Sequence, residues 1–516
     1  MVGYLVKSKT NKEDTKNFEN LTINNVVTVD EESNNRGGCM RGTKWWHFSC
    51  IPIFASLILI FLVILLPTLD EIDLRMQFML NKQVSANQDN CSFNIVESIP
   101  EGLIYTNYTI TNPSTFEVWK NLIRIAEHTI EIGSFYWSLS KSKSFPTESS
   151  QGDEIFQNLL NAGVNRNITI KIAQNVPSKS FPATDAEYLI QKKAAEVKFL
   201  NFDIFFGSGV LHTKFWIVDR KHLYLGSANL DWRALTQARF NISALGLFEF
   251  IRGLFRAIYL LQQVKELGIV FYNCSSVAED LGKIFDVYWM VGNQTTLPKK
   301  WPDSLNTVYN FKNPFNIDVN GEKNSFYISS SPPQFSPKGR TDDLVALLKV
   351  IKQAKEFIHI SVMEYMPLIE FGKHRRFWPD IDNALRKAVV ENNIKLRLLI
   401  SQWKNTKPIM IPFLKSLLAL NNVTKNAVVE IKWFKVNANS SQAKIPYARV
   451  NHNKYMVTDS GGFIGTSNWS GDYFMTTAGV SVVSHNVNGS ANAIQKELNA
   501  VFERDWNSTF AYPLLK

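Results

Sequence analysis

Apolar and polar positions follow two recurring patterns along the chain, and together they predict the same series of elements twice. A segment with helical spacing of apolar residues, FEVWKNLIRIAEH from residue 116, precedes the strand-like TIEIGSFYWS. From residue 342, DDLVALLKVIKQAK precedes FIHISVMEYM in the same order. Each half continues with a helix, a strand and a shorter strand: GDEIFQNLLNAGV, ITIKIAQN and VKFLNF in the first, and WPDIDNALRKAVV, IKLRLLIS and VEIKWFKV in the second. This order indicates an internal duplication.

The alternation of strands with helices predicts the fold class. Such alternation is typical of βαβ units, so we expect α/β halves with largely parallel, buried sheets. A repeat of this size suggests two similar halves that pack together about a pseudo-twofold axis. The Pro-rich stretch SSSPPQFSP lies at the join and is typical of a linker. The predicted divisions are a stem at 70–100, a first half at 101–328, a linker at 329–340 and a second half at 341–516.

The repeat has one irregularity, which lies in the first half. The strand GVSVVSHN begins 11 residues after Asn468, whereas the corresponding GIVFYN begins 39 residues after the equivalent Asn229. The 25 residues at 238–262 therefore have no counterpart. Charged residues interrupt this segment, which argues against a membrane span. It is either an amphipathic surface insertion or a gene-prediction artefact such as a retained intron.

The longest apolar stretch lies near the N-terminus. The 25 residues at 45–69 contain no Asp, Glu, Lys or Arg, and at about 1.5 Å per residue they can span the hydrocarbon core. A cleaved signal peptide would begin closer to the N-terminus, whereas here 44 mostly polar residues, typical of a disordered tail, come first. Basic residues precede the stretch and acidic residues follow it, so the positive-inside rule leaves residues 1–44 in the cytosol. We expect a single-pass type II membrane protein.

Composition agrees with a folded lumenal part. Hydrophobic residues make up 45% of the chain and charged residues 20%, which excludes a mostly disordered protein, and four cysteines are too few for a disulfide scaffold. The net charge of +10 is mild for 516 residues and hints at polyanionic partners. Cys91 and Cys274 follow the predicted span, and an oxidising lumen favours one disulfide between them. N-x-S/T glycosylation sequons, several of which we expect to be unused, begin at Asn90, Asn107, Asn167, Asn241, Asn273, Asn293, Asn422, Asn439, Asn468, Asn488 and Asn507.

Chemically distinctive residues occur at equivalent places of the two halves. LHTKFWIVDRKHLYLGSANLDW and NHNKYMVTDSGGFIGTSNWSGDY both contain H-x-K-x4-D followed by G-S/T-x-N. The residues are His212, Lys214, Asp219, Ser227 and Asn229 in the first half, and His452, Lys454, Asp459, Thr466 and Asn468 in the second. Because side chains alternate along a strand, the His and Lys of each motif share one face and can meet the same anion. A single H-x-K is most often an ordinary strand, but two copies at equivalent places of a repeat favour a functional site.

These residue types suit phosphoryl chemistry. Imidazole can act as nucleophile or as acid and base near its pKa of about 6.5, so two of them can divide one displacement into two steps. The lysines supply positive charge to the transition state, and we assign Ser227, Asn229, Thr466 and Asn468 to phosphate oxygens. Asp219 and Asp459 either orient an imidazole or close the structure between the halves, and the sequence favours neither. The histidines are paired with lysines and no H-E-x-x-H occurs, so we predict no metal and no cofactor.

The paired motifs resemble the signature of the phospholipase D superfamily. Further segments, GSANLDWRALTQ, VKELGIVFYNCS, SVMEYMP, RFWPDID and GTSNWSGDYF, are similar to its membrane-anchored endolysosomal branch, which includes mammalian phospholipase D family members three and four. The likeness covers most of residues 100–510 and departs from the branch at 238–262 and in lacking a second lumenal cysteine pair. It implies a phospholipase D-like duplication of two α/β sandwich halves, with a pseudo-twofold active site at their interface, after an N-terminal transmembrane helix.

The resemblance also implies a reaction and its substrates. One histidine would form a phosphohistidine while the other protonates the leaving oxygen, without a metal, and which histidine does which is left open. Members of the branch act as 5′-to-3′ exonucleases on single-stranded DNA and RNA in acidic compartments, so we expect that substrate first. A lipid phosphodiesterase or transphosphatidylase is the alternative, and a non-catalytic lumenal protein is the third. We expect a location in the endoplasmic reticulum, Golgi and endolysosome, with release as a soluble lysosomal enzyme and a homodimer as further expectations.

Overall fold

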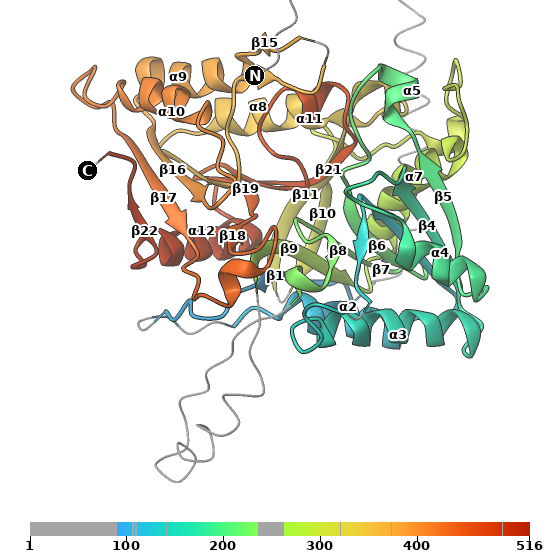
Figure 1. The fold of residues 1–516 in the computed structure, drawn as a ribbon. Coiled ribbons are helices and arrows are strands. Elements are labelled where there is room, and N and C mark those ends of the chain that lie inside the picture. The colour runs from blue at the N-terminus through green and yellow to red at the C-terminus, as the bar shows by residue number, and fades with distance from the viewer. Residues whose placement is uncertain are drawn as a thin grey trace, which may run out of the picture. The chain divides into compact units, whose positions relative to one another are not determined.

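Two mixed sheets, flanked by helices, make up the described part of the chain (Figure 1). The computed structural model describes residues 90–105, 108, 111–140, 142–235, 263–319, 321–372, 374–487 and 489–515. The predicted tail (1–44), the predicted span (45–69), the stem up to residue 89 and the irregular segment 238–262 lie outside these residues. Within the described ranges, no helix is both long and apolar enough to cross a membrane.

The first sheet has eight strands within the described residues, and all but one come from the first half. They are β1 (Ser92–Ser98), β2 (Thr129–Ser134), β4 (Thr169–Asn175), β5 (Glu196–Leu200), β6 (Lys214–Val218), β7 (His222–Gly226), β9 (Val264–Tyr272) and, from the second half, β18 (Val450–Asn451). Their order is β1-β9-β7-β6-β2-β4-β5, and β18 pairs with β9. Strands β2, β4 and β5 are parallel to one another, and the pairs β2–β6, β6–β7, β7–β9 and β9–β1 are antiparallel, whereas β18 is parallel to β9.

The second sheet repeats this arrangement with ten strands in the described part. They are β10 (Phe315–Val319), β11 (Glu322–Ser331), β12 (Thr341–Asp342), β13 (Phe357–Val362), β16 (Lys395–Gln402), β17 (Val429–Lys435), β19 (Lys454–Thr458), β20 (Gly461–Gly465), β21 (Gly479–His485) and β22 (Ala511–Pro513). Strands β13, β16 and β17 correspond to the parallel β2, β4 and β5, and β19, β20, β21 and β11 to the antiparallel β6, β7, β9 and β1. Two short pairs lie outside the sheets: β3 (Trp137–Ser138) with β8 (Leu230–Asp231), and β14 (Leu368–Ile369) with β15 (Arg376–Phe377).

The mixed character of both sheets corrects the expectation of largely parallel sheets. Three residues connect β6 to β7, and two connect β19 to β20. Connections this short permit only antiparallel pairing, since a parallel pair needs a long crossover. Each H-x-K-x4-D motif runs along one such hairpin, so the motif segments belong to the antiparallel part of each sheet. The duplicated α/β architecture itself is as expected.

The helices cover both outer faces and also fill the space between the sheets. They are α2 (Thr115–Ile125), α3 (Ser150–Val164), α4 (Thr184–Gln191), α5 (Phe202–Phe206), α7 (Ser275–Val291), α8 (Asp343–Gln353), α9 (Asp380–Asn392), α10 (Met410–Leu418), α11 (Asp472–Met475) and α12 (Ala493–Trp506). Helices α2 and α3 share a core with the first sheet, and α8, α9 and α10 share one with the second. Apolar residues of α7, α12 and both sheets form a third core, which joins the two halves. Thus α2, α3, α8 and α9 confirm the four helices predicted from apolar spacing.

Strands β1 and β11 correct two predicted boundaries. Residues 92–98, assigned to the stem, form β1, and Ile95 and Val96 within it are fully buried. The predicted linker at 329–340 begins inside β11, and Phe335 in this segment is 1% exposed. Each half therefore begins with a strand that precedes its first helix. These strands join their sheets through backbone hydrogen bonds. Their sequences, SFNIVES and EKNSFYISSS, contain many polar residues, so the apolar pattern does not predict them.

Covalent and ionic links tie the chain's distant segments together. The predicted disulfide is confirmed, since Cys91 before β1 is bonded to Cys274 at the start of α7. A buried ion network joins β1 to α12 of the second half: the guanidinium of Arg504 lies 2.6 Å from Oε1 of Glu97. Lys265 of β9 contacts Glu97 at 3.5 Å and Asp505 at 3.0 Å. Burial raises the pKa of Glu97, but Arg504 and Lys265 outweigh burial and hold its pKa at about 2.

Replacing Glu97 with Gln should lower the free energy of unfolding by about 3–5 kcal/mol, because two buried cations lose one of their two carboxylate partners and keep only Asp505. Because the folded state lowers the pKa of Glu97, its ionised carboxylate adds to the free energy of unfolding. This contribution is complete above the unfolded-state pKa of about 4.5 and is lost as the pH falls towards 2. The loss should therefore be the same at pH 7 and at pH 5 in denaturant titrations. As a control, Glu391→Gln removes an exposed pair with Lys387 and should change stability by less than about 0.5 kcal/mol. Equal effects of the two variants would contradict this account.

The predicted glycosylation sites differ in exposure. Exposed sites are Asn90, Asn167, Asn293, Asn422, Asn439 and Asn507. Asn107, Asn241 and Asn488 lie outside the described residues, and Asn273 is half-buried. Asn468 is 4% exposed, and its amide nitrogen donates to the hydroxyl of Tyr473. Asn468 is therefore one of the sequons that we expect to be unused, because its side chain lies inside the protein.

Candidate active site

The two signature histidines are held by corresponding strands of the opposite halves. His212 lies just before β6, and its backbone N–H donates to the carbonyl of Ala478 in the second half at 3.0 Å. His452 lies just before β19, and its N–H donates to the carbonyl of Lys265 in the first half at 2.8 Å. Each half thus fixes the histidine of the other. The duplication places both H-x-K motifs where the halves meet, as the sequence predicted.

The imidazole rings are oriented by acceptors on one nitrogen. Nδ1 of His212 lies 2.9 Å from the backbone oxygen of Thr466, and Nδ1 of His452 lies 2.9 Å from Oε2 of Glu266. A carbonyl or carboxylate oxygen can only accept, so Nδ1 carries the hydrogen in both rings. In the neutral rings, Nε2 then keeps a lone pair. That is the nitrogen available to attack phosphorus or to exchange a proton with a leaving oxygen.

The two lysines of the motifs are almost fully buried in this site. The ammonium groups of Lys214 and Lys454 each donate to the backbone oxygen of the histidine two residues earlier, at 2.6 Å. Burial and the charge of Lys454 lower the pKa of Lys214 well below its ordinary value. Burial lowers the pKa of Lys454 to about 7, although Glu266 and Glu364 oppose this. A bound phosphodiester anion would restore both pKa values, so the lysines form a ready anion site.

Electrostatic coupling joins the four groups into one centre. Burial is the main cause that lowers the pKa of His212 well below 6.5, followed by the charges of Lys214, Lys454 and His452. Burial also lowers the pKa of His452, and Lys454 and Lys214 add to this, whereas Glu266 raises it. Residues from opposite halves of the chain therefore act on one another's proton affinity. Both histidines are neutral in the free site near pH 7.

Glu266 is a site residue that no sequence motif indicated. It lies on β9, 2% exposed, and binds His452 through Nδ1. The hydroxyl of Ser227 donates to Oε2 of Glu266 at 2.5 Å and accepts from the backbone N–H of Leu267 at 3.0 Å. Glu266 follows the irregular segment 238–262 by four residues, where alignment of the two halves is interrupted. A buried carboxylate in an apolar strand was the only signal that could have pointed to it.

The predicted phosphate-binding residues have different surroundings. The hydroxyl of Ser227 is committed to Glu266, and that of Thr466 accepts from the backbone N–H of Val480 at 3.0 Å. Both hydroxyls therefore form contacts within the protein that hold neighbouring segments of the site in place. The amide oxygens of Asn229 and Asn468 are buried and have no hydrogen-bond partner in the described part of the chain. Since side-chain amide orientations are assigned by their surroundings, these two amides can still turn donors towards a phosphate.

The two aspartates of the motifs lie at the far end of the hairpins from the histidines. Asp219 accepts three backbone N–H bonds at 2.7–2.8 Å from the residues that begin β2, Glu127 to Thr129. Asp459 accepts equivalent bonds from Lys355 to Phe357 at the start of β13. Seven residues of extended chain, roughly 23 Å, separate each aspartate from its histidine. This geometry fits neither of the interpretations left open by the sequence: each aspartate fixes the start of a central strand in its own half, and it neither orients an imidazole nor links the halves.

Aromatic rings border the first histidine. The ring of Tyr473 lies 5.0 Å from that of His212 in an edge-on arrangement, and Phe135 lies 5.3 Å from it. The ammonium of Lys214 lies 5.5 Å from the centre of the Phe135 ring. These rings exclude water and explain the strong effect of burial on this side of the site. Among the residues that the structure describes, no group of three or more His, Cys, Asp or Glu side chains is placed to hold a metal ion.

Comparison with known proteins gives the same assignment over most of the chain. The family model described as "PLD3/4, PLD-like domain" matches residues 106–252 and 257–439. A protein named 5′-3′ exonuclease PLD3 from Xenopus laevis is 44% identical over 476 residues, which cover 90% of each chain. The human protein of the same name is 42% identical over 438 residues, covering 84% of this chain and 83% of its own. Among solved structures, a phosphatidylserine synthase from Haemophilus influenzae aligns with a TM-score of 0.47 at 9% identity, covering 78% of this chain and 86% of its own.

Proposed function

Since the chain belongs to the PLD3/4 family of the phospholipase D superfamily, we propose that it is a phosphodiesterase that removes nucleotides from the 5′ end of single-stranded DNA or RNA. The observation that carries this proposal is the pair of inward-facing imidazoles with Nε2 free, beside two buried lysines. The Xenopus and human relatives that match this chain over most of its length bear the exonuclease name.

The proposed reaction uses the two histidines in turn. Nε2 of one histidine attacks phosphorus, a P–N bond forms, and the P–O bond to the leaving oxygen breaks. The second histidine, which has taken up a proton from the acidic solvent on Nε2 before this step, gives that proton to the leaving oxygen. In the second step this histidine removes a proton from water, whose oxygen attacks phosphorus and breaks the P–N bond. Lys214 and Lys454 stabilise the negative charge that develops on the phosphoryl oxygens in both steps.

The chemistry of the site should be independent of metal ions, because ammonium groups occupy the place where a cation would neutralise phosphate. We expect the full chain to digest a 5′-hydroxyl single-stranded oligonucleotide at pH 5 in the presence of excess EDTA, at a rate within about twofold of the rate without it. The measurement is the release of mononucleotides over time. A loss of activity that Mg²⁺ or Zn²⁺ restores would contradict this proposal. Turnover of phosphatidylglycerol vesicles without turnover of the oligonucleotide would favour the lipid alternative.

The location is a second part of the proposal. The apolar stretch at 45–69, with basic residues before it and acidic residues after it, supports a type II membrane anchor. A disulfide and six exposed sequons in the described domain suit a lumenal compartment. In microsomes, the domain should be protected from added protease and should lose mass after glycosidase treatment. A protease-sensitive, unglycosylated domain would overturn this topology. Release as a soluble lysosomal enzyme and a homodimer stay proposals without structural support.

A further inference from the structure

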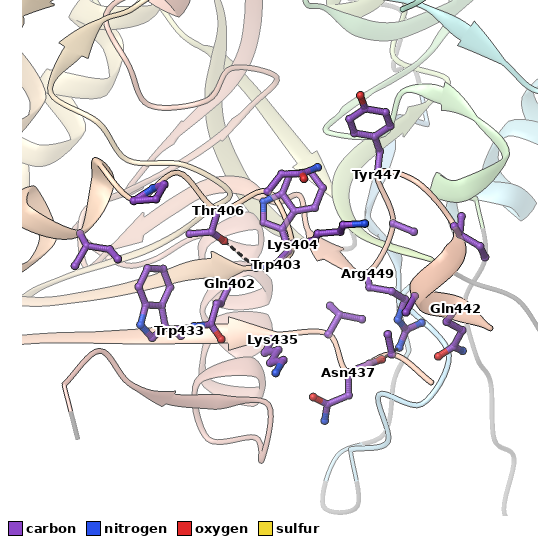
Figure 2. Close-up of a pocket in the computed structure, with 18 residues that line it drawn as sticks. Gln402, Trp403, Lys404, Thr406, Trp433, Lys435, Asn437, Gln442, Tyr447 and Arg449 are labelled. Carbon is purple, nitrogen blue, oxygen red and sulfur yellow. Dashed lines mark hydrogen bonds between the residues drawn. The ribbon is translucent and has the colours of Figure 1, made fainter. Parts of the chain in front are cut away.

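A second concave site lies in the second half, apart from the two histidines. It is a cavity of about 750 Å³, within the range that holds small ligands. It lies at the carboxyl ends of the neighbouring parallel strands β16 and β17, and α/β sheets commonly bind ligands at such an edge. Figure 2 shows Trp403 and Lys404 between the side formed by Trp433 and the segment that carries Tyr447 and Arg449.

The lining combines aromatic rings with positive charge. Trp433 is 6% exposed, Trp403 is half-buried and Tyr447 is 57% exposed, so ring surface extends from the floor to the rim. Lys404 and Lys435 are exposed and form no ion pair with any carboxylate that the structure describes. None of the 18 lining residues is Asp or Glu. Rings with unpaired ammonium groups suit a ligand with both a flat face and a negative charge.

Hydrogen bonds hold the segments around the cavity in place. The backbone N–H of Trp403 donates to the hydroxyl of Thr406 at 2.8 Å, which closes the turn after β16 (Figure 2). Arg449 donates to the backbone oxygens of Glu101, at 2.9 Å, and of Asn437, and so connects three segments around the cavity. A preformed site loses little conformational entropy on binding.

The cavity adjoins the catalytic centre along two segments. Arg449 lines it and precedes His452 by three residues of extended chain, roughly 10 Å. In the loop after β16, Lys407 lies 3.4 Å from Oε2 of Glu364, and Glu364 in turn raises the pKa of Lys454. A ligand that extends roughly 10 Å beyond the cavity along this segment can therefore reach His452.

From these contacts we propose that the cavity binds a nucleotide of the single-stranded substrate, on the side of the scissile phosphodiester that stays with the strand. Its base stacks against Trp403, and its phosphates lie beside Lys404 and Lys435. The proposal rests on the exonuclease function proposed above and adds a second binding site to it. A zwitterionic lipid headgroup such as phosphocholine fits less well, because the ammonium groups repel its quaternary ammonium end and no lining residue is Asp or Glu.

Binding should be measured on the full chain with His212→Ala, so that the probe is not consumed. The probe is a fluorescent single-stranded 12-mer with a 5′-hydroxyl, followed by anisotropy at pH 5. Adding Trp403→Ala should raise the Kd about 5- to 150-fold, which is the usual contribution of one stacked base. Trp403→Phe should recover most of the affinity, since a smaller ring still stacks. If Trp403 were only structural, its substitutions would lower the stability of the protein, but the affinity for the 12-mer would not decrease in the order Trp, Phe, Ala.

A salt titration separates charge from stacking. Lys404→Ala should reduce the slope of log K against log salt concentration by about 0.7, the value for one phosphate contact on a single strand. Lys425→Ala is the matched control, because Lys425 is also exposed and in the same half but lies before β17, at the opposite end of that strand. The slope for Lys425→Ala should equal that of the His212→Ala chain without further substitution. Equal slopes for Lys404→Ala and Lys425→Ala would overturn the proposal.

The outcomes separate this proposal from the proposed function. Weaker 12-mer binding by Trp403→Ala supports the cavity even if no cleavage of oligonucleotides is ever observed. Unchanged binding overturns it even if the exonuclease activity is confirmed. Loss of binding to phosphatidylglycerol vesicles alone would also overturn it.

Discussion

Replacing His212 or His452 singly with alanine is expected to lower kcat on a single-stranded oligonucleotide by at least about 10³-fold, because each cycle needs one imidazole as nucleophile and the other as acid and base. Both rings present Nε2 to the same site, and neither has a neighbour that could replace it. The double variant should be hardly worse than either single variant, since the two groups act as a unit. The measurement is single-turnover cleavage with enzyme in excess.

The control for this prediction is His128→Ala. His128 is exposed and lies at the end of the hairpin that holds Asp219, away from the histidine pair. Only its backbone N–H is used there, so the substitution should leave kcat within about twofold. Cleavage by His212→Ala or His452→Ala at the rate of His128→Ala would mean that a different pair of groups does the chemistry.

Glu266→Gln should lower kcat by about 10²- to 10⁴-fold with little change in KM, because the substitution removes the charge that stabilises protonated His452. Glu266 raises the pKa of His452 against the effect of burial. Without it that pKa falls further, so the limb of the pH–rate profile that belongs to His452 should move about 1–3 pH units towards acid. The profile of kcat/KM between pH 3 and 8 is the readout.

A matched carboxylate provides the control for Glu266. Glu131 on β2 is also buried and charge-paired, with Arg220 at 2.5 Å, but it lies outside the site. Glu131→Gln should destabilise the fold while the pH profile keeps its shape. If Glu266→Gln lost activity only in proportion to unfolded protein, with an unmoved profile, Glu266 would be a structural residue and not a positioning one.

The sequence predicts the repeated part of the fold well, because both copies carry the same apolar spacing. Helix α2 illustrates this: Val118, Trp119, Leu122 and Ile123 recur at helical spacing, and all four are buried. Strands β1 and β11 show where this fails, since they are specified by pairing with β9 and β21, partners far away in the sequence. The antiparallel pairing of the motif hairpins follows from their very short connections. The alternation of helices and strands, on which the prediction of parallel sheets was based, does not contain this information.

The sequence predicts those residues of the site whose chemical type by itself indicates their role. His212, Lys214, His452 and Lys454 come together as expected, since a duplicated motif leaves few other arrangements. The residues that orient the histidines could not be predicted from residue type. Glu266 has no counterpart with a carboxylate in the second half, where the backbone oxygen of Thr466 does the same task.

The central claim, a covalent intermediate on one of two paired histidines, can be tested by mass spectrometry of the full chain. The enzyme would be mixed with a 5′-hydroxyl oligonucleotide at pH 5 in EDTA, quenched in alkali within one turnover, and digested. The account predicts a nucleotide phosphate attached to the peptide that contains His212 or to the one that contains His452. Turnover with an adduct on any other residue, or with no adduct on either peptide at any time point, would contradict it.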